Sequence, residues 1–89
     1  MWLLPKPNAC AAKVESLVVS AGSSRRVRTV AFYDGRHRIS TDHVGLSGVF
    51  SAVWRAGKTA LGRHVLRAVV TDRRGAHAQA RRIVRVCHR

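Results

Sequence analysis

The sequence has few acidic residues and few aromatic ones. Of its 89 residues only 4 are Asp or Glu and 6% are aromatic, whereas 17 are Lys or Arg. Glu15 is the only glutamate, so the paired carboxylates of a glycosidase would have to be aspartates. The chain also lacks any run of about 18 apolar residues, so we expect no transmembrane helix.

Motifs of catalysis and metal binding are also missing. There is no Gly-x-Ser-x-Gly element, and neither cysteine has a Cys-x-x-Cys partner. The aspartates Asp34, Asp42 and Asp72 are isolated along the chain and are more typical of turns than of a calcium site. These absences predict a protein that is not an enzyme and that holds neither a metal ion nor a cofactor.

The length and the alternation of apolar residues define the kind of fold. A chain of 89 residues forms one small domain with a thin core. Apolar residues recur at every second position, and Asp-Gly and Gly-containing turns separate these runs, as in antiparallel strands. We predict strands over residues 13–21, 27–33, 36–41, 49–55, 63–71 and 78–87. The prediction is therefore an all-β sandwich or small barrel of five to seven strands, residues 13–89, preceded by an extended leader, residues 1–12.

The same alternation selects the residues that should face inward. Trp54 is expected at the centre of packing, and His64 is expected to be half-buried, with its ring bonded to a nearby backbone carbonyl. Tyr33 is the one aromatic residue expected to face outward. The predicted core comprises Leu17, Val19, Val30, Phe32, Phe50, Trp54, Leu66, Ala68, Val70, Val84 and Val86.

The two cysteines lie at opposite ends of the predicted domain. Cys10 precedes the first strand and Cys87 ends the last, so a disulfide between them would join the two ends. Such a bond would contribute about 4–5 kcal/mol in the loop-entropy model and would indicate an oxidising, extracytoplasmic compartment. Two independent thiols, or one reactive thiol, are the alternatives.

The strong positive charge indicates which kind of partner the protein could attract. The formal net charge is +13, which predicts attraction to polyanions such as nucleic acid or acidic polysaccharide. If the strands around residues 72–75 form a hairpin, Arg63 and Arg67 share a face with Arg81 or Arg85. An anion-binding face is thus predicted from Arg36, Arg38, Arg55, Arg63, Arg67, Arg81 and Arg85. A GC-rich genome would also enrich surface arginine, and a solvated arginine face protects a sheet edge from aggregation.

Several of these positions together resemble bacterial immunoglobulin-like domains. The matching order is Val30-x-Phe32-x-Asp34-Gly35, then Phe50-x-Ala52-x-Trp54, then Gly62-x-His64-x-Leu66-x-Ala68 with Asp72 and Gly75. The resemblance implies a small antiparallel sandwich of about six or seven strands, whose first strand is irregular or missing here. It also implies a non-catalytic structural or binding module, an accessory domain of a larger bacterial protein with neighbouring domains as partners. Two alternatives remain, a basic polyanion-binding module and a fragment appended to an enzyme.

Overall fold

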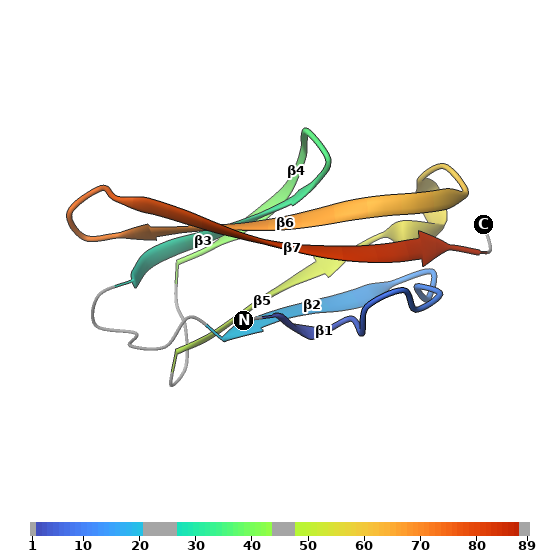
Figure 1. The fold of residues 1–89 in the computed structure, drawn as a ribbon, viewed down its shortest axis with the longest axis horizontal. Coiled ribbons are helices and arrows are strands. Elements are labelled where there is room, and N and C mark those ends of the chain that lie inside the picture. Colours follow the sequence, from blue (N-terminus) through green and yellow to red (C-terminus); the bar gives the residue numbers. More distant parts are fainter. Residues whose placement is uncertain (1, 21–26, 44–47, 88–89) are drawn as a thin grey trace.

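The chain folds into two antiparallel sheets that pack face to face. The computed structural model describes residues 2–20, 27–43 and 48–87, and within them there are seven strands. The three-stranded sheet has the order β1 (Trp2–Leu4), β2 (Glu15–Ser20) and β5 (Val49–Trp54). The four-stranded sheet has the order β4 (His37–Asp42), β3 (Val27–Asp34), β6 (Gly62–Asp72) and β7 (His77–Val86). Figure 1 shows the two layers, which confirm the predicted all-β sandwich.

All six strands predicted from the alternation are present, within two residues at each end. The segment between the strands predicted over residues 49–55 and 63–71 contains one short 3-10 turn, η1 (Ala56–Lys58). Strand β6 is the longest, and it pairs with β3 on one side and with β7 on the other. The β6–β7 hairpin turns at Asp72, whose Oδ1 accepts hydrogen bonds from the backbone N–H groups of Arg74 and Ala76 at 2.8 and 2.9 Å. The sequence assigned Asp72 to a turn of this kind.

The core agrees closely with the predicted inward positions. All the predicted core residues are buried except Val70, which is partly buried and packs against the others. Phe32, Phe50 and Leu17 are among the largest fully buried side chains. Burying one such side chain stabilises a fold by about 1.5–3 kcal/mol, so these few residues supply much of the cohesion of a small sandwich.

The N-terminal segment contributes more than its expected role as an extended leader. Trp2–Leu4 forms the edge strand β1, whose pairing with β2 shifts register between Trp2 and Leu4. The first strand is therefore present and irregular. Trp2 and Ala11 are each only 5% exposed and belong to the core, which the sequence did not predict. The indole of Trp2 packs edge-on against the ring of Phe32, with 5.9 Å between centroids.

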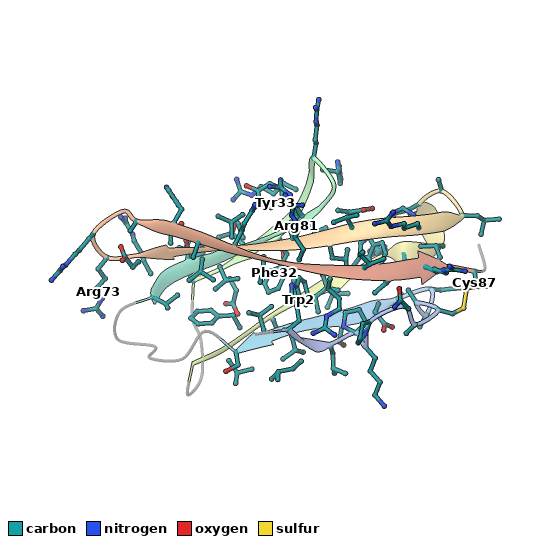
Figure 2. The ribbon with its side chains drawn as sticks, viewed as in Figure 1. Trp2, Phe32, Tyr33, Arg73, Arg81 and Cys87 are labelled. Atoms are coloured by element: carbon teal, nitrogen blue, oxygen red, sulfur yellow. A yellow bond between two sulfur atoms is a disulfide. The ribbon has the colours of Figure 1, made fainter. Side chains whose placement is uncertain are left out.

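Backbone and covalent contacts hold the rest of this segment beside β7. The backbone N–H of Asn8 donates to the carbonyl of Ile83, and that of Ala11 donates to the carbonyl of Arg85, both at 2.8 Å. Between them, Cys10 forms a disulfide with Cys87, as predicted. The bond closes a loop with a sequence separation of 77 residues, at the end of the sandwich shown in Figure 2.

Candidate functional site

The positive charge is distributed unequally between the two sheets. Strands β1, β2 and β5 contain no Lys or Arg, whereas the four strands of the other sheet contain seven arginines. These are Arg28, Arg38, Arg63, Arg67, Arg81, Arg82 and Arg85. The strands of the three-stranded sheet carry one charged residue, Glu15, and we call this sheet the uncharged sheet; the four-stranded sheet is strongly basic.

Four of the predicted arginines meet on the outer side of β6 and β7. Because Leu66 and Ala68 are fully buried, the alternate positions of β6 face away from the core. The strand register places Arg63 opposite Arg85 and Arg67 opposite Arg81. We call these four residues the arginine face. They have the arrangement that the sequence predicted for a β6–β7 hairpin.

Aromatic and polar contacts orient one of these arginines. The guanidinium of Arg67 lies over the ring of Tyr33, 4.7 Å from its centroid, in a cation–π contact. Its Nε donates to the carbonyl of Gly35 at 3.0 Å, and its Nη1 donates to Oε1 of Gln79 at 3.2 Å. Tyr33 therefore faces outward, as predicted, and it is labelled with Arg81 on the basic sheet in Figure 2. Arg67 is fixed in place, while Arg63, Arg81 and Arg85 remain exposed.

Arg82 has a different position from the arginine face. It has the inward parity of Val84, and its Nη2 donates to the carbonyl oxygen of Trp2 at 2.9 Å. This bond connects β7 to β1 across the sandwich. Arg82 was not among the predicted anion-binding residues, and its contact indicates a structural role.

The remaining predicted arginines lie nearer to the edge of β4. Arg36 lies in the turn between β3 and β4 and is exposed. Arg38 and Arg55 line one groove, of about 350 Å³, between the neighbouring ends of β4 and β5. The other lining residues of this β4–β5 groove are His37, Ile39, Val53, Trp54, Lys58 and Thr59. The sequence singled out neither His37 nor Lys58 as a partner of these arginines, because no spacing relates positions on different sheets.

The half-buried His64 forms an ion pair with Asp34. Its Nδ1 lies 2.9 Å from the Asp34 carboxylate oxygens, and its Nε2 donates to the carbonyl of Ala60 at 2.6 Å. Burial lowers the pKa of His64, but the bonds to Ala60 and Asp34 and the charge of Asp34 outweigh burial and raise the pKa above 6.5. The predicted bond to a carbonyl is confirmed, and the carboxylate partner was missed because Asp34 had been assigned only to a turn.

The carboxylates do not gather into a metal site. No group of three or more His, Cys, Asp or Glu side chains suited to a metal ion occurs in the described ranges. Glu15 accepts a bond from the backbone of Ala12, and Asp42 accepts one from the backbone of Ser51. In the same part of the chain, no helix is long and apolar enough to cross a membrane.

Comparison with known proteins finds the fold but no sequence family. No protein-family model matches the chain, and no curated protein sequence matches it. Among solved structures, one of the fibronectin(III)-like modules of Clostridium thermocellum CbhA is similar, with a TM-score of 0.78 and 24% sequence identity. The likeness covers 97% of this chain and 92% of that one. At this identity it shows the fold, an immunoglobulin-like sandwich of the fibronectin(III) type.

Proposed function

We propose that this chain is a non-catalytic immunoglobulin-like module, a structural or binding accessory domain of a larger bacterial protein. The observation that supports this most is the end-to-end likeness to a fibronectin(III)-like module, which leaves only 3% of the chain uncovered (100% minus 97%). The alternating pattern between Val30 and Gly75 consists of residues that fill the core, form turns or lie in the sheets. A scaffold of this kind offers surfaces rather than a catalytic cleft.

The uncharged sheet supports a role beside other domains. Its exposed apolar residues include Leu3 and Leu4 on β1 and Val49 and Val53 on β5, with Val53 62% exposed. A sheet whose strands contain no Lys or Arg, in a chain of net charge +13, suits packing against a neighbouring domain.

Two measurements test this proposal. Sequencing the transcript that encodes the chain should show one continuous reading frame with further domains. A frame closed by stop codons on both sides of this module would contradict the accessory role. The purified chain should also release no product from chromogenic ester, phosphate and glycoside substrates. Saturable turnover of any of them would contradict the non-catalytic assignment.

The compartment proposed for the module is an oxidising one, because the Cys10–Cys87 disulfide needs such conditions to persist. Thiols can be blocked during lysis of the native host and the intact mass measured before and after reduction. We expect a gain of two hydrogen atoms only on reduction. Blocked cysteines in the unreduced sample would show free thiols in the cell and would contradict the assignment.

A second candidate function is polyanion binding through the arginine face. Like charges directly opposite on paired strands destabilise a sheet, and this face has two such pairs. A bound chain of sulfate, phosphate or carboxylate groups would relieve that repulsion. Guanidinium groups also suit these anions, because they donate two parallel hydrogen bonds to one group.

The test uses heparin as the polyanion and variants that remove equal charge. Arg63→Ala/Arg85→Ala deletes one pair of the arginine face, and Arg73→Ala/Arg74→Ala deletes two exposed arginines of the β6–β7 turn. Affinity should fall steeply with salt, and the first variant should weaken binding more than the second. Equal losses in the two variants would show attraction to net charge alone and would refute a site on this face. The turn position of Arg73, far along the sandwich, is visible in Figure 2.

A further inference from the structure

The β4–β5 groove lies where the two sheets separate. The strands are joined near one end, where the backbone N–H of Ser51 donates to Oδ2 of Asp42 at 2.9 Å. Near the other end the groove opens between His37–Ile39 and Val53–Thr59. β4 and β5 are outer strands of different sheets in the described topology, so no backbone ladder fills this gap.

The charged lining of the groove has only one sign. Arg38 comes from β4, whereas Arg55 and Lys58 come from the segment after β5, and no Asp or Glu lines the groove. The imidazole of His37 adds another positive charge when it is protonated. Three fixed cations around about 350 Å³ repel one another, and a bound anion would remove that repulsion.

The backbone that presents two of these cations is held in place. Ala56 is fully buried, the N–H of Gly57 donates to the carbonyl of Lys13 at 2.9 Å, and Thr59 closes the turn through two bonds to Ala56 O. A Cβ at Gly57 would lie 3.2 Å from side-chain atoms of Lys13, so the turn packs tightly against the chain before β2. The main chain at Arg55 and Lys58 is therefore positioned before any ligand arrives, which reduces the entropic cost of binding.

We propose that the β4–β5 groove binds a small sugar that carries a sulfate or phosphate ester. Arg55 can donate paired hydrogen bonds to ester oxygens, and Lys58 supplies a compact charge. Arg38 can donate through the guanidinium N–H groups that remain beside the bond from its Nη2 to Thr41 Oγ1. Ile39 and Val53 give the groove apolar wall for the carbon skeleton of a ring. The volume is at the small end of ligand pockets, which suits one or two sugar rings.

The surroundings of the groove favour a sugar over a nucleotide. Nucleotide sites commonly stack the base on an exposed aromatic face. Trp54 is the one aromatic side chain besides His37 in the lining, and it is only 3% exposed. The groove thus recognises a charged ester group and apolar ring atoms, without a platform for a base.

The experiment titrates the ¹⁵N-labelled, disulfide-bonded chain with a sulfated disaccharide and with glucose 6-phosphate at near-physiological salt. Amide shifts should saturate and should centre on residues 37–39 and 53–59. Arg55→Ala/Lys58→Ala should weaken binding by about tenfold or more, because it removes two charged donors. The equal-charge controls Arg73→Ala/Arg74→Ala and Arg63→Ala/Arg85→Ala should change the affinity by less than about twofold.

Several results would overturn the proposal. Shifts that do not saturate, or that follow Arg63 and Arg85, would place binding outside the groove. A control variant that weakens binding as much as Arg55→Ala/Lys58→Ala would show attraction to net charge only. If inorganic sulfate binds as tightly as both sugars, the sugar ring is not recognised. If adenosine monophosphate binds more tightly than both sugars, the ligand class is wrong. None of these outcomes depends on the heparin test of the arginine face, because that test uses a different probe and does not alter Arg55 or Lys58.

Discussion

Replacing His64 by glutamine should destabilise the domain most at low pH. The ring nitrogens of His64 face two acceptors, the Asp34 carboxylate at 2.9 Å and the Ala60 carbonyl at 2.6 Å. An ionised carboxylate and a carbonyl can only accept hydrogen bonds, so both bonds form together when the ring is a protonated imidazolium with two N–H donors. The ring also lies edge-on to Trp54, with 5.6 Å between centroids. The substitution therefore removes a positive charge that joins β6, β3 and the segment before β6.

The size of the loss follows from the burial of the pair. The side chains of His64 and Asp34 are 12% and 15% exposed. The pair is therefore largely buried but still in contact with solvent. Exposed pairs contribute about 0–1 kcal/mol, and breaking a buried pair costs about 3–5 kcal/mol. We expect His64→Gln to lower the free energy of unfolding by about 2–3 kcal/mol where the histidine is charged. In a domain of this size the melting temperature should fall by about 10–20 °C.

The loss should depend on pH in one direction. The pKa of His64 is raised in the folded state, so protonation favours the fold. Its contribution is complete below the unfolded value of about 6.5 and is lost as pH rises through the folded pKa. The stability difference between wild type and His64→Gln should therefore be largest near pH 5 and smaller near pH 9.

Thermal unfolding followed by far-ultraviolet circular dichroism at several pH values measures this difference. His77→Gln is the matched control, because His77 is exposed on β7 and its Nδ1 is hydrogen-bonded to the Thr71 hydroxyl and not to a carboxylate. That variant also removes one imidazole, so it corrects for the general effect of histidine charge in a basic chain. A difference for His64→Gln that is constant with pH, or that grows as pH rises, would refute the doubly donating imidazolium.

Three further predictions concern the core and the joined ends. Cys10→Ser/Cys87→Ser should lower the free energy of unfolding by about 4–5 kcal/mol in urea titrations, and an unchanged midpoint would contradict the loop-entropy argument. Trp54→Ala should cost about 3–5 kcal/mol in thermal melts, whereas Val53→Ala, at a site 62% exposed, should be nearly neutral. Trp2→Ala should cost a similar amount, but Trp2→Phe should cost less than about 1.5 kcal/mol. The buried Nε1 of Trp2 has no hydrogen-bond partner in the described residues, so its removal leaves nothing unpaired. Equal losses for the two Trp2 variants would contradict the expectation that packing of an aromatic ring, and not the indole N–H, stabilises the fold at this position.

Alternation alone was sufficient to predict most of this fold. In β6 the residues His64, Leu66 and Ala68 face inward because a strand has a period of two, and one buried face fixes which set that is. The β6–β7 hairpin then follows from the turn at Asp72, and with it a shared face of Arg63 and Arg67 with Arg81 or Arg85, whose exact register the structure supplies. Local rules of strand and turn are enough for each of these steps.

The features that alternation could not predict depend on contacts between segments that are distant in the sequence. Strand β1 has three residues, which is too short for a period to be recognised, so the burial of Trp2 was missed. The pairing of Asp34 with His64 requires the register of β3 on β6, which the sequence leaves open. The approach of Arg38 to Arg55 depends on how one sheet crosses the other, and no sequence spacing encodes that angle.

The separation of charge between the sheets allows the proposed functions to coexist. A neighbouring domain packed on the uncharged sheet would cover Leu3 and Val49, while the arginine face lies on the opposite side of the sandwich. The β4–β5 groove opens at the lateral edge, and Val53 borders both the groove and the uncharged sheet. A domain docked on that sheet would therefore leave the arginine face free and would approach the groove only at Val53. Binding of an anionic sugar in the intact protein should then respond to interdomain contacts, whereas heparin binding at Arg63 and Arg85 should not.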